Sequence, residues 1–249
     1  MLKDPRLSTY ICLSRGYHVQ ELLQTSGSEL PLHIYAPKRF YNFADLDHGR
    51  RSLRLIMEGF ERVERAKLTL FPPPLEHDVT ADASELSQSR VSRLQSMEFI
   101  VYGPNTTLWC SIPPLFPTFK FPHLAELSCT RCNFGCLSTL LVPTLRRLKL
   151  VNISRMRAVH LVEHLRPLCL LEELVLEDVL TGIPEVLDSD YQQAYFPKLR
   201  QLAIQDVYAT LASLISFATS NTHQQQIYPY CITTPVFYRT IVINSSSPF

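Results

Sequence analysis

Glycine and net charge are both scarce in this sequence. Only seven of the 249 residues are glycine, and 24 basic against 23 acidic side chains leave a net charge of +1. The phosphate-binding patterns G-x-x-x-x-G-K-[ST] and G-x-G-x-x-G do not occur, which argues against nucleotide-binding folds. Balanced charge produces no long-range field, so we expect neither nucleic acid nor an anionic membrane as a partner.

Long apolar runs are lacking as well. No stretch approaches the roughly 18 consecutive apolar residues that span a bilayer, and no apolar region typical of a secretory signal follows Met1. The seven cysteines are odd in number and lie mostly in apolar segments, a distribution typical of reduced thiols rather than of a disulfide framework. We therefore expect a cytoplasmic or nuclear protein.

Leucine, by contrast, occurs 38 times and recurs in a repeat. The pattern is L-x-x-L-x-[LIC], with another apolar residue three positions later, as in the first half of a leucine-rich repeat. Four clear copies and two looser ones start at Leu124, Leu145, Leu171 and Leu199, and at Val63 and Leu94. Because successive copies are offset by between 21 and 31 residues, the repeat is degenerate.

Each copy is predicted to form a short strand, because apolar and polar residues alternate over its second half. Between copies the apolar residues take helical spacing, which predicts helices at 52–63, around 157–165 and at 211–217. Strand, turn and helix repeated with every strand parallel predict an α/β fold. The expected architecture is a leucine-rich-repeat-like solenoid, with a curved parallel sheet on the concave side and helices on the convex side.

Two segments depart from the repeat. Residues 1–219 are expected to form the degenerate repeat domain, with a polar, proline-rich loop insertion at about residues 72–90. Residues 220–249 contain a single formal charge, Arg239, and are predicted to be a non-repeat C-terminal tail or cap. Alternation around 236–241 fits either a last strand or an irregular end.

Three segments occur in an order that is found in a known family. Leu22–Ile34 is similar to a helix, an R-S-G turn and a P-L-x-[LIV] strand, with Thr25 where arginine is usual. Leu53–Val63 is similar to a helix that ends in an R-[IV] step into a strand, and Pro167–Glu177 to a P-x-L-E-E-L-x-L-E block. In this order the segments resemble fungal F-box proteins with degenerate leucine-rich repeats.

This resemblance covers roughly residues 14–217 and implies the substrate-recognition part of an F-box ubiquitin-ligase adaptor. In the family, an amphipathic helical F-box module docks a Skp1-type adaptor, and no such module is recognisable before these repeats. We therefore expect a protein ligand, and the departure places the Skp1-type adaptor in doubt. A truncated relative without independent function is an alternative that the same departure allows.

An enzymatic alternative rests on the segment from His160 to His164. It matches H-x-x-E-H, in which two histidines one helical turn apart bind zinc and a glutamate, here Glu163, serves as the base. Such a zinc-dependent hydrolase needs an acidic third ligand from elsewhere, and Asp206 is the last acidic residue in the chain. The same residues fit the exposed face of a repeat helix. We favour that interpretation and predict no catalytic residue and no cofactor.

A second metal hypothesis concerns Cys129, Cys132 and Cys136, whose spacing could bring three thiolates to one ion. Cys129 occupies the third leucine position of its repeat, and Cys132 occupies the apolar position that follows. Because free cysteine behaves as a small hydrophobic residue, we interpret both as core residues and predict no metal site.

The candidate binding site consists of the residues between the leucines, which point away from the core. Basic and acidic positions adjoin there, so the concave face is predicted to hold a protein ligand. A sheet face that is merely solvated is the alternative interpretation. The predicted protein-binding residues are Arg65, Lys67, Glu98, Glu126, Ser128, Thr130, Arg147, Lys149, Glu173, Val175, Glu177, Gln201 and Gln205. Thr69 is expected to point to the same side.

Overall fold

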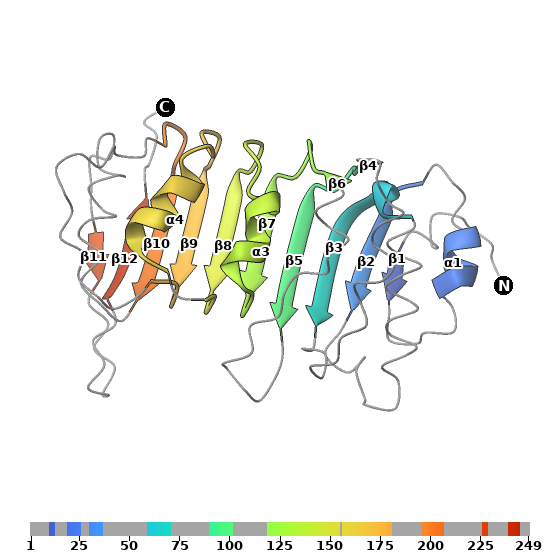
Figure 1. Cartoon of the computed structure of the whole chain (residues 1–249), viewed down its shortest axis with the longest axis horizontal. Coiled ribbons are helices and arrows are strands. Elements are labelled where there is room, and N and C mark those ends of the chain that lie inside the picture. The colour runs from blue at the N-terminus through green and yellow to red at the C-terminus, as the bar shows by residue number, and fades with distance from the viewer. Residues whose placement is uncertain are drawn as a thin grey trace. The chain divides into compact units, whose positions relative to one another are not determined.

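The computed structural model describes ten stretches of the chain. They are residues 10–12, 19–25, 30–36, 59–70, 90–101, 119–154, 156–180, 196–206, 226–228 and 239–244. The chain divides into two compact units, residues 1–124 and 125–249, and each is described by itself (Figure 1).

A parallel sheet of four strands forms the first unit. Its strands are, in spatial order, β1 (Tyr10–Cys12), β2 (Leu32–Ala36), β3 (Val63–Leu70) and β5 (Ser96–Val101). The helix α1 (Val19–Thr25) precedes β2, and the 3-10 helix η5 (Phe60–Arg62) leads directly into β3. Two short strands, β4 (Arg90–Val91) and β6 (Phe119–Lys120), form a separate parallel pair.

Apolar side chains fill one face of this first sheet. Ile34, Ala66 and Met97 stand beside one another in register on β2, β3 and β5, and all three are buried. Ser92 is a buried polar residue in this unit, and its hydroxyl lies 3.3 Å from the carbonyl oxygen of Phe60 and 3.2 Å from the backbone nitrogen of Leu94. The alternation of the looser repeat copies therefore produces the expected one-sided core.

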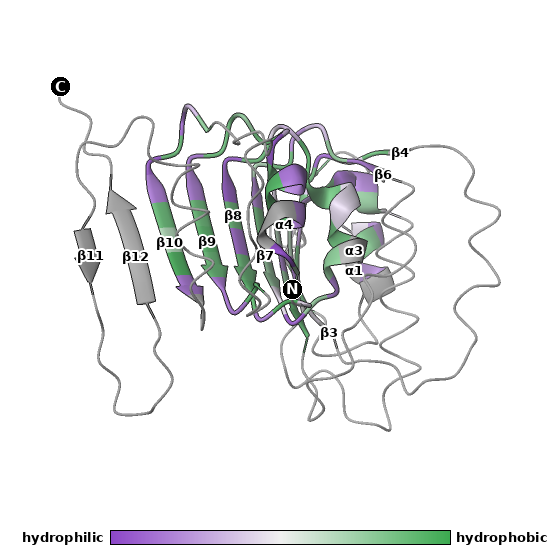
Figure 2. Ribbon diagram, turned by 60° about the vertical axis from the view of Figure 1, so that its left-hand side comes forward, coloured by the Kyte–Doolittle hydropathy of each residue, from purple (hydrophilic) through white to green (hydrophobic). Residues whose placement is uncertain are grey.

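The second unit contains four more parallel strands. They are β7 (Glu126–Thr130), β8 (Arg147–Val151), β9 (Glu173–Glu177) and β10 (Gln201–Asp206), paired in chain order. The strand β12 (Arg239–Asn244) pairs antiparallel with β10, and β11 (Gln226–Tyr228) pairs antiparallel with β12. Figure 2 shows apolar residues in the middle of β9 and β10 and polar residues at their ends.

Short helices link the strands of the second unit. Between β7 and β8 lie α3 (Phe134–Leu137) and the 3-10 helix η8 (Ser138–Leu140), and between β8 and β9 lies α4 (Ala158–Leu165). Both α-helices lie on the same side of the sheet (Figures 1 and 2). Their buried side chains, which include Leu137 and Leu161, complete an apolar layer beneath the strands.

The chain leaves three successive strands of this unit through the same backbone conformation. Arg131, Asn152 and Asp178 each directly follow a strand, and their φ values of 59°, 47° and 52° lie in the left-handed region. Each donates its backbone N–H to a carbonyl of the following strand, at 2.9, 2.6 and 2.8 Å respectively. A left-handed residue therefore adds one more hydrogen bond to the ladder while it turns the chain out of the strand.

Because asparagine and aspartate tolerate this conformation and arginine does not, Arg131 is strained. We expect Arg131→Asn to raise the free energy of unfolding by about 1 kcal/mol. Urea denaturation followed by far-UV circular dichroism measures the change. Asn152→Ala is the matched variant in the opposite direction and is expected to lower the same free energy by a similar amount. A loss of stability in Arg131→Asn would contradict this account of the corner.

The predicted solenoid-like arrangement of parallel strands is confirmed within each unit, with a strand at every copy of the repeat. In the predicted tail or cap at 220–249, for which no strand direction was predicted, β12 is a strand that runs antiparallel to β10. Most of the expected helix at 52–63, nearly all of the insertion at 72–90 and the helix at 211–217 lie outside the described residues. In the described part of the chain, no helix combines the length and apolar character needed to cross a bilayer.

Candidate functional site

The predicted binding residues lie on the strands with their side chains accessible. In β8, Leu148 and Leu150 are fully buried, whereas Arg147 and Lys149 between and beside them are exposed. The other eleven predicted residues, on β3, β5, β7, β9 and β10, follow the same rule and are half-buried or exposed. Thr69 does not, because it is only 3% exposed beside Ile100 of β5.

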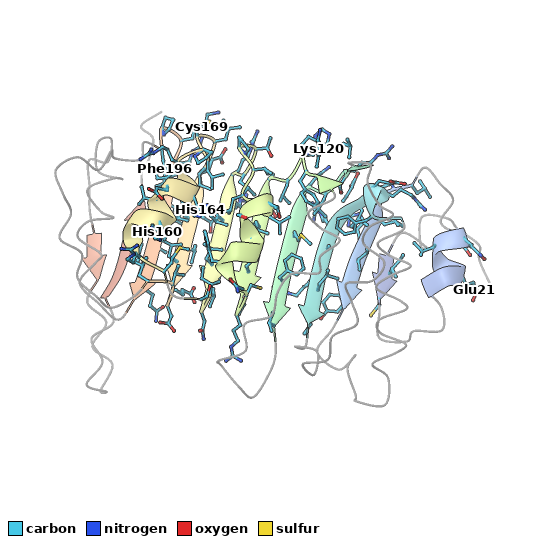
Figure 3. The ribbon with its side chains drawn as sticks, viewed as in Figure 1. Glu21, Lys120, His160, His164, Cys169 and Phe196 are labelled. Carbon is cyan, nitrogen blue, oxygen red and sulfur yellow. The ribbon has the colours of Figure 1, made fainter. Side chains whose placement is uncertain are left out.

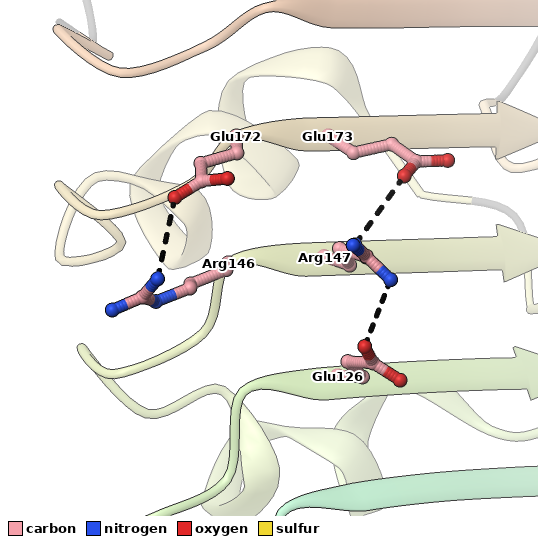
Figure 4. A network of polar contacts seen from close by, with 5 residues as sticks. All are labelled: Glu126, Arg146, Arg147, Glu172 and Glu173. Carbon is pink, nitrogen blue, oxygen red and sulfur yellow. Dashed lines mark hydrogen bonds and ion pairs between the residues drawn. The ribbon is translucent and has the colours of Figure 1, made fainter.

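Arg147 bridges two carboxylates on the exposed side of the second unit. Glu126, Arg147 and Glu173 occupy the same height on β7, β8 and β9, because these strands pair without a shift in register. The Arg147 guanidinium lies 2.9 Å from Glu126 Oε1 through Nη1 and 3.8 Å from Glu173 Oε2 through Nε (Figure 4). Parallel register thus turns three residues that are distant in sequence into one row of alternating charge.

Further ion pairs lie on either side of this row. Lys149 Nζ is 3.3 Å from Glu177 Oε1, two residues further along the neighbouring strand than its register partner Val175. Arg146 Nη1 is 3.7 Å from Glu172 Oε1 where the chain enters β8 and β9 (Figure 4). We call the solvent-accessible residues Glu126, Arg147, Lys149, Glu173 and Glu177 the charged ladder. Two cations and three carboxylates give the charged ladder a net charge of −1.

Solvent limits the energy of the charged ladder. The Arg147 side chain is 61% exposed and that of Glu126 is 46% exposed. Ion pairs between such accessible groups contribute about 0.2–1 kcal/mol each, because water and salt screen them. The pairs therefore set a pattern of charge on the surface, and they contribute little to the stability of the fold.

A groove lies on the exposed side of the first sheet, with a volume of about 510 Å³. Side chains from β1, β2, β3 and β5 line it, among them the predicted residues Arg65, Lys67 and Glu98. Lys67 Nζ and Glu98 Oε2 form an ion pair at 2.8 Å. The groove is therefore built from the same strand positions that were predicted to contact a ligand.

His33, Tyr35 and Cys12 line this groove and were not predicted as binding residues. His33 and Tyr35 alternate with Leu32 and Ile34 on β2, so the period of two was a sufficient signal for them. Cys12 lies on β1, a strand of three residues with no copy of the leucine pattern. Sequence reasoning therefore had no signal for the edge of the groove that β1 forms.

The residues of the zinc hypothesis lie on α4, as their helical spacing predicted (Figure 3). His160 Nε2 is 3.2 Å from the Arg157 guanidinium, and the ring of His164 packs against Phe134 with 5.0 Å between centroids. Both histidines and Glu163 are exposed. Across the described residues, no three histidine, cysteine, aspartate or glutamate side chains are grouped to hold a metal ion.

Cys129 and Cys132 are buried, as core positions of the repeat should be. Burial raises the pKa of the Cys129 thiol well above its ordinary value, and the nearby Cys132 raises it further. Cys132 Sγ lies 3.6 Å from the carbonyl oxygen of Thr130. Because only a thiolate is a strong ligand or nucleophile, Cys129 is an inert core residue at neutral pH. The side chain of Cys136 lies outside the described residues.

Comparison of the chain with protein-family models, with curated proteins and with solved structures finds no match.

Proposed function

We propose that the chain is a protein-binding module of the leucine-rich-repeat type, whose ligand contacts the residues between the buried apolar positions of the strands. The observation that carries the proposal is the in-register charged ladder on β7, β8 and β9. Parallel strands without register shifts hold side chains in straight rows at a spacing of about 4.8 Å. Such rows present a fixed pattern of charge to a partner.

The weakness of the ion pairs supports this proposal. A partner that offers both signs of charge can exchange its groups for those of the charged ladder, because each exposed pair costs only about 0.2–1 kcal/mol to break. The arrangement favours binding of a partner with the complementary order of charges and disfavours binding of one that places like charges opposite. The charged ladder therefore acts mainly on specificity, and neighbouring residues such as Val175 and Gln201 supply further contact area.

The resemblance to fungal F-box proteins supports a narrower proposal. In that family the repeats bind the protein that is to be ubiquitinated, so this chain would supply the recognition part of a ubiquitin-ligase adaptor. A Skp1-type adaptor bound to the full chain is the specific expectation of this narrower proposal. Its absence from a complex that contains another stable partner would remove the ligase role and leave the binding role intact.

The test is affinity capture with the full chain and with a variant of the charged ladder, called the face variant. We expect Arg147→Gln combined with Lys149→Gln to reduce recovery of a specific partner at least about fivefold, because both cations of the charged ladder are removed. Quantitative mass spectrometry of proteins captured from the source cells measures the recovery. Thermal melting by circular dichroism checks that the variant is folded.

A matched control removes the same charge elsewhere. Arg157→Gln combined with Arg166→Gln neutralises two exposed arginines that flank α4, and it should leave recovery unchanged. Equal recovery by the face variant and by this control would refute binding through the charged ladder. Equal loss in both would show that the partner responds to net charge alone, which refutes the proposal equally.

A further inference from the structure

The groove of the first unit differs from the charged ladder in its charge balance. Among its lining residues, Arg65 and Lys67 are cationic and Glu98 is anionic, which leaves a net charge of +1. Glu98 is already paired with Lys67 at 2.8 Å. In the described part of the chain, no ion pair joins a carboxylate to Arg65, and this side chain is exposed.

Arg65 stands in the middle of a row that crosses the groove. It lies between His33 of β2 and Ser96 of β5, its register partners on the two neighbouring strands. Both line the groove, and an imidazole and a hydroxyl can donate hydrogen bonds to an anion that Arg65 holds. The row therefore combines a guanidinium with two flanking polar groups of suitable kind.

The next row offers an aromatic surface. Tyr35 is the register partner of Lys67 and is 47% exposed. Cys12 of β1 stands beside Tyr35 in the same row. An exposed tyrosine provides apolar contact area and a phenolic hydroxyl at once. The row around Arg65 can bind an anion, and the adjacent row around Tyr35 can contact the backbone and side chains of a peptide.

We infer that this groove binds an acidic, extended peptide segment of a protein ligand, with one carboxylate of the segment on Arg65. The inference deepens the proposed protein-binding function and rests on it. Guanidinium and carboxylate can form two parallel charge-assisted hydrogen bonds, which are stronger than neutral ones and add geometric specificity. The groove crosses four strands, or about three spacings and roughly 14 Å. That length fits about four residues of extended chain.

The affinity of the chain for an acidic peptide tests the inference directly. Fluorescence anisotropy would follow the peptide Gly-Glu-Asp-Glu-Asp-Gly, labelled with tetramethylrhodamine, during titration with the full chain. A neutral peptide with glutamine and asparagine in place of the acids, and a basic peptide of the same length, serve as comparisons. We expect the acidic peptide to bind at least about tenfold more tightly than either, because only it supplies side-chain carboxylates to Arg65.

Variants connect the binding to the groove. Arg65→Gln should weaken the acidic peptide about tenfold or more, and Tyr35→Ala should weaken it by a smaller factor. Arg157→Gln, which removes an exposed arginine at the start of α4, should leave peptide affinity unchanged. An equal effect of Arg65→Gln and Arg157→Gln would refute the assignment to the groove, as would equal binding of the three peptides.

Inorganic phosphate separates a peptide groove from a general anion site. Phosphate at a concentration matched to the peptide should not displace it, whereas displacement would show that the site selects any anion and would overturn the inference. Failure of the acidic peptide to bind, while partner capture still depends on Arg147 and Lys149, refutes the groove and leaves the proposed function standing. If the acidic peptide does not bind and partner capture does not depend on Arg147 and Lys149, the proposed function itself is refuted.

Discussion

Leu150→Ala is expected to lower the free energy of unfolding by about 2–5 kcal/mol, the range for removing a buried leucine side chain. Leu150 is fully buried in the middle of β8. Its register partners are Cys129 on β7 and Leu176 on β9, and both are buried as well. Because neighbours on both sides are held by backbone ladders, they cannot move inward to fill the space, and a cavity remains.

Lys149→Ala is the matched control on the same strand. Lys149 points to the opposite side and is 49% exposed, and among the described residues its only ion pair is with Glu177. Its removal should therefore change the free energy of unfolding by less than about 1 kcal/mol. Chemical denaturation followed by far-UV circular dichroism measures both variants. Similar losses in the two variants would contradict the assignment of Leu150 to the core and of Lys149 to the surface.

The strands of the repeat could be predicted because their pattern permits one interpretation. In β8 the leucines alternate with Arg147 and Lys149, and in β9 the leucines lie between Glu173 and Glu177, so a shift by one residue would bury those charges. The same argument identified the exposed binding residues. It failed at Thr69, where alternation predicts exposure but the side chain is buried, because the pattern says nothing of what packs beside the end of a strand.

The partners within the charged ladder could not be predicted. Arg147 meets Glu126 and Glu173 only because the strands pair without shifts, and the offsets of 21 and 26 residues between these copies contain linkers of different length. Local sequence does not define the register across such linkers. The left-handed corners were partly visible, since Asn152 and Asp178 are residue types that favour them, whereas Arg131 gives no such signal.

Strands outside the repeat could not be fully predicted, for a related reason. β1 has only three residues, and its pairing with β2 is a long-range choice that no local pattern records. The alternation near Arg239 indicated a strand without indicating its direction, and β12 proves to be antiparallel. Because β1 contributes to the groove around Arg65, the groove could be recognised only in the folded sheet.

Phe60→Ala is expected to lower the free energy of unfolding by about 3–5 kcal/mol, as for other buried aromatic residues. Phe60 is fully buried in η5, directly before β3. Its ring meets that of Phe121 edge to face, with 6.4 Å between centroids and 87° between planes. Phe60 thus fixes the entrance of β3 against a segment about sixty residues later in the chain, and its truncation removes apolar area and a ring contact together.

Further variants separate the loss of apolar area from the loss of the ring contact. A double-mutant cycle with Phe60→Leu and Phe121→Leu should give a coupling energy of about 0.5–1.5 kcal/mol for the ring pair. Tyr35→Ala removes an aromatic ring of the same unit that is 47% exposed, and should cost less than about 1 kcal/mol. Urea denaturation by circular dichroism measures all of them. If Tyr35→Ala proved as costly as Phe60→Ala, Tyr35 would be a core residue, and the groove beside Arg65 would lose its aromatic wall.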